Sequence, residues 1–257
     1  MEPRHLAELL RLTGLRAEKD LPLLYPLVFG FPLQMVILTD PAFPLPIWGA
    51  LQIRNHVVQH RPVSAGAVLD LETRVAGQRI LDRGAEVDLH TTIRSRDDLV
   101  WENVNTFYYR GRFGEAGTAS PLARSPEPGD AVVAQWFMPA GGGWRFAGLT
   151  GDYNGIHWVR CYARLFGFRR DFHHPQLVLG QCMARVAPHD PALPQRLDAW
   201  LKGPVYYNSK VQLWATAEPN DATFALVPDG ESRPAIIGRW RSGATVSPLL
   251  EERDGTA

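Results

Sequence analysis

The sequence predicts an α+β protein made of two halves, in each of which a central helix is wrapped by an antiparallel sheet. Two features lead to this prediction. Each half contains one strongly apolar segment, at 21–39 and at 175–187, together with shorter runs in which apolar and polar residues alternate. A stretch rich in small and turn-forming residues, 114–130, lies between the halves.

The apolar segment 21–39 is nearly long enough to cross a bilayer. However, Pro26, Gly30 and Pro32 interrupt it, Gln34 is polar, and no second segment of this kind follows. Proline breaks helices that no partner supports, which disfavours a membrane span. We therefore predict that the segment is buried core and that the protein has no membrane partner.

Alternating runs follow this segment, at 68–75, 86–94 and 99–110. Within the run 68–75, leucine, threonine and valine occupy alternate positions from 69 to 75, and charged residues occupy the positions between them. The same alternation is present in 86–94. Such period-two runs are typical of half-buried antiparallel strands with one face in water.

The stretch 114–130 is rich in glycine, proline, alanine and serine and has no apolar periodicity. This composition is typical of a linker. We accordingly divide the chain into an N-terminal unit of residues 1–115, a linker of residues 116–130 and a C-terminal unit of residues 131–257.

The second half repeats the order of the first. The apolar segment 175–187 suits a buried helix, and Pro175 suits its first turn. We expect this helix to be wrapped by strands from 198–242, with a matching unit in 21–112. The remaining elements predicted here are a strand at 131–139, a loop and helix at 144–168, and strands at 205–215, 222–228 and 235–242.

Composition excludes several classes of function. The chain of 257 residues has 27 lysines and arginines and 27 aspartates and glutamates, so it carries no electrostatic footprint for nucleic acid. Cys161 and Cys182 are too few for a disulfide framework, and the N-terminus lacks the features of a signal peptide. A cytoplasmic location is therefore expected. The motifs GxxxxGK, GxGxxG, GxSxG and HExxH are absent.

The chemistry is concentrated in the run 150–157, TGDYNGIH. It places a carboxylate, Asp152, five residues before an imidazole, His157, across a turn that contains glycine and asparagine. These residue types allow the positive φ values that a sharp turn needs. An aspartate and a histidine that converge on one water form a general acid/base pair.

This run resembles the signature of the MaoC-like hydratases and dehydratases. The pattern continues with Tyr-Ala-Arg at 162–164 and Gly-Phe at 167–168, and His174-Pro175 stands where the family has His-Gly. The resemblance is specific over about 144–182 and implies a double hot-dog fold. The first half lacks the motif, and its expected contribution is one wall of an acyl cavity.

The resemblance also implies an enzyme, a hydro-lyase that hydrates enoyl thioesters and dehydrates 3-hydroxyacyl thioesters without a cofactor. Asp152 and His157 would bind the catalytic water and transfer a proton. The substrate would be an acyl thioester of coenzyme A or of an acyl carrier protein. Neighbouring hot-dog units pair edge to edge, so a homodimer is left open.

Two positions depart from the family pattern. Gly155 replaces the family's proline, and Pro175 replaces the glycine whose backbone N–H bonds the thioester carbonyl. Proline has no N–H, and loss of one such donor typically costs about 10²–10³ in rate. We predict that a neighbouring N–H takes over. The substrate-binding residues predicted on this basis are Asn154, Gly155, His174, Pro175, Gln176 and Leu177.

Alternatives remain for each of these features. Asp152 is also suited to a helix cap or an Asx-turn, and His157 to a structural role. A non-catalytic acyl-thioester binding or scaffold protein, which Pro175 favours, is the alternative function, and a hot-dog thioesterase is a third. No carboxylate or cysteine spacing completes a metal site around His157, His173 and His174, so we predict no metal.

Overall fold

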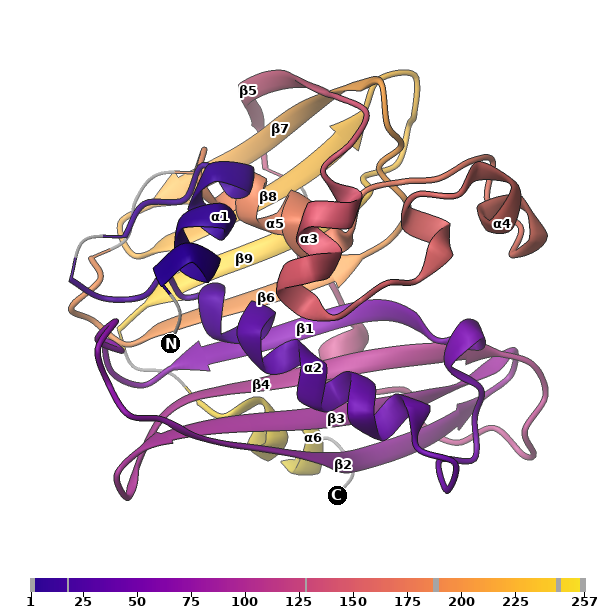
Figure 1. Cartoon of the computed structure of the whole chain (residues 1–257), viewed down its shortest axis with the longest axis horizontal. Coiled ribbons are helices and arrows are strands. Elements are labelled where there is room, and N and C mark those ends of the chain that lie inside the picture. Colours follow the sequence, from indigo (N-terminus) through magenta and orange to yellow (C-terminus); the bar gives the residue numbers. More distant parts are fainter. Residues whose placement is uncertain (1–2, 18, 128, 187–189, 244–245, 255–257) are drawn as a thin grey trace.

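The computed structural model describes residues 3–17, 19–127, 129–186, 190–243 and 246–254 (Figure 1). The helices are α1 (Pro3–Thr13), α2 (Tyr25–Thr39), α3 (Gly143–Thr150), α4 (Arg160–Leu165), α5 (Pro175–Met183) and α6 (Pro248–Asp254). Short 3-10 helices are η1 (Ile47–Gly49), η2 (Pro121–Ala123) and η3 (Gly155–His157). None of the helices in these residues has the length and apolar character needed to cross a membrane.

All strands of the described residues belong to one antiparallel sheet of nine strands, in the order β2-β3-β4-β1-β6-β9-β8-β7-β5. The two halves are joined where β1 pairs with β6. The first half supplies β1 (Leu51–Gln59), β2 (Asp70–Leu81), β3 (Gly84–Ser95) and β4 (Asp98–Arg110). The second supplies β5 (Ala131–Met138), β6 (Gln195–Leu201), β7 (Ser209–Glu218), β8 (Asp221–Pro228) and β9 (Ile236–Ser242).

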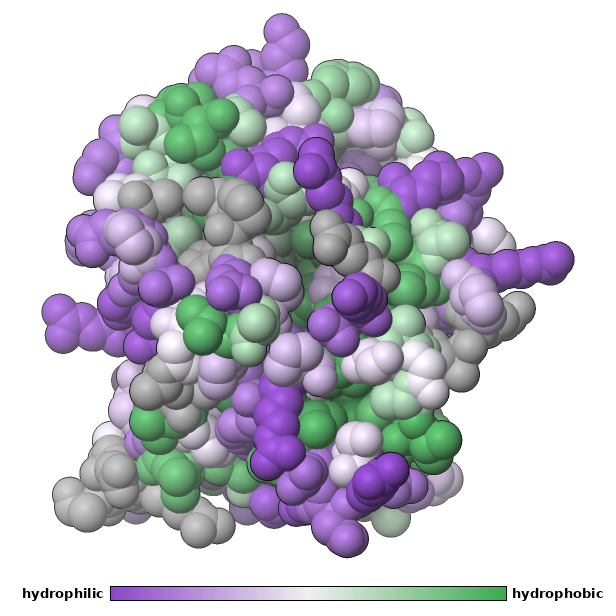
Figure 2. Space-filling view, turned by 90° about the vertical axis from the view of Figure 1, so that its left-hand side faces the viewer, coloured by the Kyte–Doolittle hydropathy of each residue, from purple (hydrophilic) through white to green (hydrophobic). Residues whose placement is uncertain are grey.

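Helix α2 lies across the strands of the first half, and α5 lies against those of the second half (Figure 1). One side of α2 is buried, including Tyr25, Val28 and Phe31, as expected for core. Its opposite side is exposed at Leu33 and Val36. On the side of the molecule turned to the viewer in Figure 2, hydrophilic and hydrophobic residues are intermixed.

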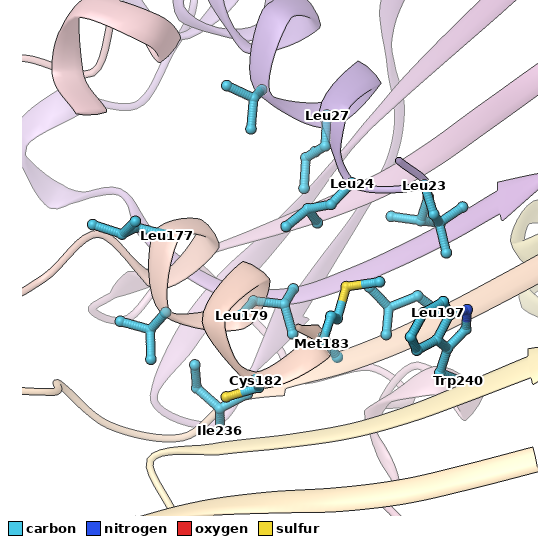
Figure 3. Close-up of a cluster of buried hydrophobic side chains, with 14 of the residues drawn as sticks. Leu23, Leu24, Leu27, Leu177, Leu179, Cys182, Met183, Leu197, Ile236 and Trp240 are labelled. Carbon is cyan, nitrogen blue, oxygen red and sulfur yellow. The ribbon is translucent and has the colours of Figure 1, made fainter. Parts of the chain in front are cut away.

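A single apolar core crosses the boundary between the halves. Figure 3 shows leucines at the start of α2 beside Leu177, Cys182 and Met183 of α5 and Trp240 of β9. Gly180 permits the close approach of α1 to α5, because a Cβ atom there would lie 2.6 Å from the Thr13 side chain of α1. Helix α5 is buried, as predicted for 175–187, but its helical part ends at Met183, and residue 187 lies outside the described residues.

The prediction that one face of the first-half strands is in water is wrong for β3 and β4. In β4, Glu102 and Thr106 are exposed by only 2% and 1%, and β3 is buried in the same way. Glu86, Asp88 and His90 are exposed by only 4%, 2% and 6%. The outer face of the sheet, opposite α2, is covered because the chain between the halves and helix α6 fold back over it. Trp200 donates a hydrogen bond to the carbonyl oxygen of Leu122, within the predicted linker, at 2.8 Å.

Buried ion pairs occupy this covered face. Arg54 donates two hydrogen bonds to Glu86, at 2.8 and 2.6 Å. Glu102 accepts hydrogen bonds from His60 and His90, at 2.9 Å each, and from Ser247 beside α6, at 2.8 Å. Burial tends to raise the pKa of Glu102, but these hydrogen bonds outweigh it and lower the pKa to about 2. A carboxylate so placed stays ionised and anchors α6 to the first half.

Candidate active site

The run 150–157 forms a tight loop between α3 and η3. Gly151 ends α3 with a positive φ of 71°, which turns the chain sharply. Oδ1 of Asp152 then accepts a hydrogen bond from the backbone N–H of Asn154 at 3.2 Å. The side chain of Asn154 in turn caps η3 by accepting from the N–H of Ile156 at 3.2 Å. The loop is therefore rigid, and Asp152 does adopt the Asx-turn that the sequence offered as its alternative role.

The second carboxylate oxygen of Asp152 is turned toward His157. Oδ2 of Asp152 lies 3.7 Å from Nε2 of His157. This separation is too long for a direct hydrogen bond and short enough for one oxygen atom to contact both groups. The structure thus brings the two predicted catalytic side chains together, and the Asx-turn uses only the other carboxylate oxygen.

The tautomer of His157 follows from its surroundings. Its Nδ1 lies 3.1 Å from the carbonyl oxygen of Phe172, which accepts only, so Nδ1 carries the proton. Nε2 is left with its lone pair facing Asp152. Burial, followed by the neighbouring His174, holds the pKa of His157 well below its usual value, against the opposing effect of the Phe172 carbonyl. His157 is therefore neutral at physiological pH, the state that a general base requires.

His174 supports this loop from behind. Its side chain is fully buried and stacks on the ring of His157, with ring centroids 3.8 Å apart. Its Nε2 lies 3.1 Å from the backbone carbonyl oxygen of Asp152, so Nε2 donates a proton there. Burial lowers the pKa of His174, and the nearby Asp152 opposes this. The imidazole thus connects the start of α5 to the loop.

Asp152, His157 and His174 also form the kind of donor set that holds a transition metal, since their ligand atoms lie within 4.8 Å of one another. A metal would need the lone pair of Nε2 on His174. In this structure that atom faces a carbonyl oxygen and carries a hydrogen. The arrangement therefore fits a hydrogen-bonded loop better than a metal centre, and the absence of a metal stays a prediction.

The loop forms one wall of a cavity of about 570 Å³. The opposite wall comes from the first half, with Phe31 and Met35 of α2, Gln52 of β1 and Phe107 of β4. Lys202, after β6, and Arg110, at the end of β4, also line it. A second cavity of about 440 Å³ adjoins it around Trp48. Both are lined mainly by apolar side chains, as binding sites for organic ligands usually are.

The predicted substrate-binding residues divide into two groups. Asn154, Gly155 and Pro175 line the cavity, together with Asp152 and His157. His174, Gln176 and Leu177 do not line it, and their side chains are buried behind its wall. The first-half residues of the cavity had no motif to mark them, because they approach the loop only in the folded chain.

Comparisons with known proteins agree with this architecture. No protein-family model matches the chain. It is 29% identical over 193 residues, 74% of this chain and 68% of the relative, to 3-hydroxyacyl-thioester dehydratase X of Mycobacterium tuberculosis. The crystal structure of HtdX of Mycobacterium tuberculosis matches with a TM-score of 0.80 and 26% identity, over 94% of this chain and 96% of that one.

More distant structures show the fold. A MaoC-like dehydratase from Phytophthora capsici matches with a TM-score of 0.76 and 19% identity, over 96% of this chain and 94% of that one. A Mycobacterium tuberculosis protein described as a double hot-dog matches with a TM-score of 0.55 and 17% identity, over 94% of this chain and 91% of that one. The protein is thus an α+β double hot-dog, as predicted. The predicted resemblance to MaoC-like dehydratases is confirmed as well.

Proposed function

We propose that this protein is a hydro-lyase that reversibly hydrates enoyl thioesters and dehydrates 3-hydroxyacyl thioesters. The relative named as a 3-hydroxyacyl-thioester dehydratase supports the reaction class. The observation that carries the assignment of residues is the approach of Asp152 Oδ2 to His157 Nε2, 3.7 Å, at the wall of an apolar cavity.

In the hydration direction, a water molecule donates one hydrogen bond to Asp152 and one to His157. Nε2 of His157 takes a proton as the water oxygen bonds to C3 of the enoyl group. The C2–C3 π electrons move toward the thioester carbonyl, and the proton taken from water is returned to C2. Dehydration follows the same steps in reverse.

The thioester oxygen needs hydrogen-bond donors as charge develops on it. Pro175 lines the cavity but has no N–H to give. Among the described residues, the backbone N–H groups of Gln176 and Leu177 have no hydrogen-bond partner, as expected for the first turn of a helix. Gln176 and Leu177 do not line the cavity themselves, but they directly follow Pro175, which does. We propose that the positive end of the α5 dipole, to which these N–H groups contribute, stabilises the oxyanion.

We expect Pro175→Ala and Pro175→Gly both to raise kcat/KM for hydration, because each restores an N–H at a position that lines the cavity. Pro175→Gly should also lower the free energy of unfolding by about 1 kcal/mol, since glycine adds flexibility to the first turn. Steady-state kinetics and urea unfolding measure the two effects. A fall in kcat/KM in both variants, with stability unchanged, would contradict this role for the helix start.

The function is tested by mixing the protein with crotonyl and longer-chain enoyl thioesters and following the absorbance of the conjugated double bond. Absorbance should fall, and the 3-hydroxyacyl product should appear with no free thiol. Release of free thiol would identify a thioesterase instead. Binding without either change would identify an acyl-thioester binding protein.

The carrier and the assembly belong to the same proposal. The substrate is an acyl thioester of coenzyme A or of an acyl carrier protein, and comparing kcat/KM for the two carriers separates them.

We propose a homodimer, which sedimentation velocity tests. A cytoplasmic location is supported by Cys161 and Cys182, which are both free thiols.

A further inference from the structure

Gln52 faces the cavity because β1 contains a bulge. In the pairing of β1 with β4, Arg54 lies opposite Thr106, whereas Gln52 lies opposite Phe107, so one extra residue, Ile53, is inserted in β1. Regular alternation would place Gln52 on the same face as Arg54, which points to the outer ion pairs. The bulge instead turns Gln52 to the inner face, where it lines the cavity. Bulges commonly re-aim side chains near sites in this way.

Gln52 is also the end of a buried chain of carboxamides that lies between α2 and the sheet. Asn103 donates through Nδ2 to the backbone carbonyl oxygen of His56 at 3.3 Å. Gln34 of α2 donates through Nε2 to Oδ1 of Asn103 at 3.3 Å and accepts at Oε1 from Asn105 at 2.6 Å. Oδ1 of Asn105 accepts from Nε2 of Gln52 at 2.8 Å.

The direction of this chain is fixed at its buried end. The carbonyl oxygen of His56 only accepts, so it sets the amide of Asn103 with nitrogen toward it. Each following amide must then accept at its oxygen and donate from its nitrogen, through Gln34 and Asn105 to Gln52. Hydrogen bonds linked in one direction polarise one another. The consequence is that Gln52 donates one of its two N–H groups to Asn105, and its carbonyl oxygen is not used in the chain.

That oxygen has no hydrogen-bond partner within the described part of the chain, and the cavity that Gln52 lines is also lined by the apolar side chains of Phe31, Met35, Ile53 and Phe107. An acceptor without a partner in a mainly apolar cavity favours binding of a ligand that brings a hydrogen-bond donor over binding of one that does not.

We infer that Gln52 is a specificity-determining residue that accepts a hydrogen bond from an O–H or N–H group of the substrate. This inference rests on the proposed function and names a further contact in the same cavity. Two parts of an acyl thioester offer such a donor, a hydroxyl group on the acyl chain and an amide N–H of the pantetheine arm.

The test compares wild type, Gln52→Leu and the surface control Gln78→Leu on four enoyl substrates. These are a plain enoyl-CoA, the same chain with a terminal hydroxyl, the plain chain on N-acetylcysteamine, and the plain chain on ethanethiol, which has no amide. Loss of one hydrogen bond should lower kcat/KM about tenfold for the substrates that provide the donor. Gln78 lies on the exposed edge strand β2, so Gln78→Leu should match wild type.

The pattern of losses identifies the donor. A loss confined to the hydroxylated chain assigns the contact to the acyl chain. A loss on every substrate except the ethanethiol ester assigns it to the pantetheine amide. Equal losses on all four, or none, would overturn the inference.

If Gln52→Leu does not fold, Gln52→Met preserves the unbranched shape and provides the same comparison. Binding of the matching saturated thioesters by calorimetry gives the affinity ratios without turnover. Wild type that binds these ligands with the expected dependence on Gln52 but hydrates none of the substrates would overturn the proposed function and leave this contact standing.

Discussion

Asp152→Asn and His157→Ala are each expected to lower the rate of enoyl-thioester hydration by about 10²–10⁴, the usual contribution of a proton-transfer group. Asparagine keeps the shape of Asp152 and its Asx-turn acceptor but removes the charge that faces His157. Steady-state kinetics on an enoyl thioester measure the loss, with circular dichroism as the check on folding. The exposed Asp97→Asn serves as the matched control and should retain full activity.

Two further measurements separate a catalytic pair from two structural residues. The double variant should be little worse than the single ones, because the groups act as a unit. The pKa of His157 is held well below its usual value, so activity should persist at pH values below 6.5 and disappear only when His157 becomes protonated. Folded single variants with wild-type turnover would show that the reaction does not use this pair.

Asp198→Ala is expected to lower the free energy of unfolding by about 3–5 kcal/mol, since it removes the anion at the centre of a buried charge cluster. Asp198 accepts hydrogen bonds from His56 at 2.8 Å, Arg196 at 2.9 Å and Arg241 at 2.8 Å. Without the carboxylate, His56 and Arg196 remain buried and lose this acceptor. The urea midpoint, at unchanged dependence on urea concentration, measures the loss.

The matched control for this effect is Asp221→Ala. Asp221 pairs with Arg239 on the neighbouring strands β8 and β9, but the two side chains are 32% and 41% exposed. Exposed pairs typically contribute about 0–1 kcal/mol. Similar losses for Asp198→Ala and Asp221→Ala would mean that burial of the outer face adds nothing to the strength of its ion pairs.

Local patterns were sufficient to predict most strands. The runs 86–94, 99–110 and 222–228 correspond to β3, β4 and β8. Strand β6, which pairs with β1 at the junction of the two halves, differs from these predicted strands. Alternation does not mark β6 as a strand of its own, because charged Arg196 and Asp198 are buried there and bond His56 and Glu251, which lie far away in the sequence.

The candidate site likewise contains residues whose place was predicted from the local sequence and residues whose place was not. Asp152 and His157 are five residues apart, so the motif alone predicted that they converge, and their atoms do lie 3.7 Å apart. His174 was expected to bind substrate, whereas the structure places it behind the loop, stacked on His157. Gln52 carried no signal in the sequence, since its orientation depends on a bulge and on amides up to 53 residues away.

The pairing of β1 with β6 has a consequence for how the two halves come together. His56 and Asp198 lie directly opposite one another in this ladder, and Nδ1 of His56 lies 2.8 Å from Oδ1 of Asp198, within hydrogen-bond distance. A shift of β1 by one residue relative to β6 would place His56 opposite Leu197 or Ala199, whose side chains belong to the apolar core. It would also turn the side chains of the shifted strand to the opposite face of the sheet. Misaligned docking of the halves would therefore bury unpaired charges along the whole junction. The buried polar partners of β1 and β6 therefore favour the native alignment of the two halves over the alignments shifted by one residue.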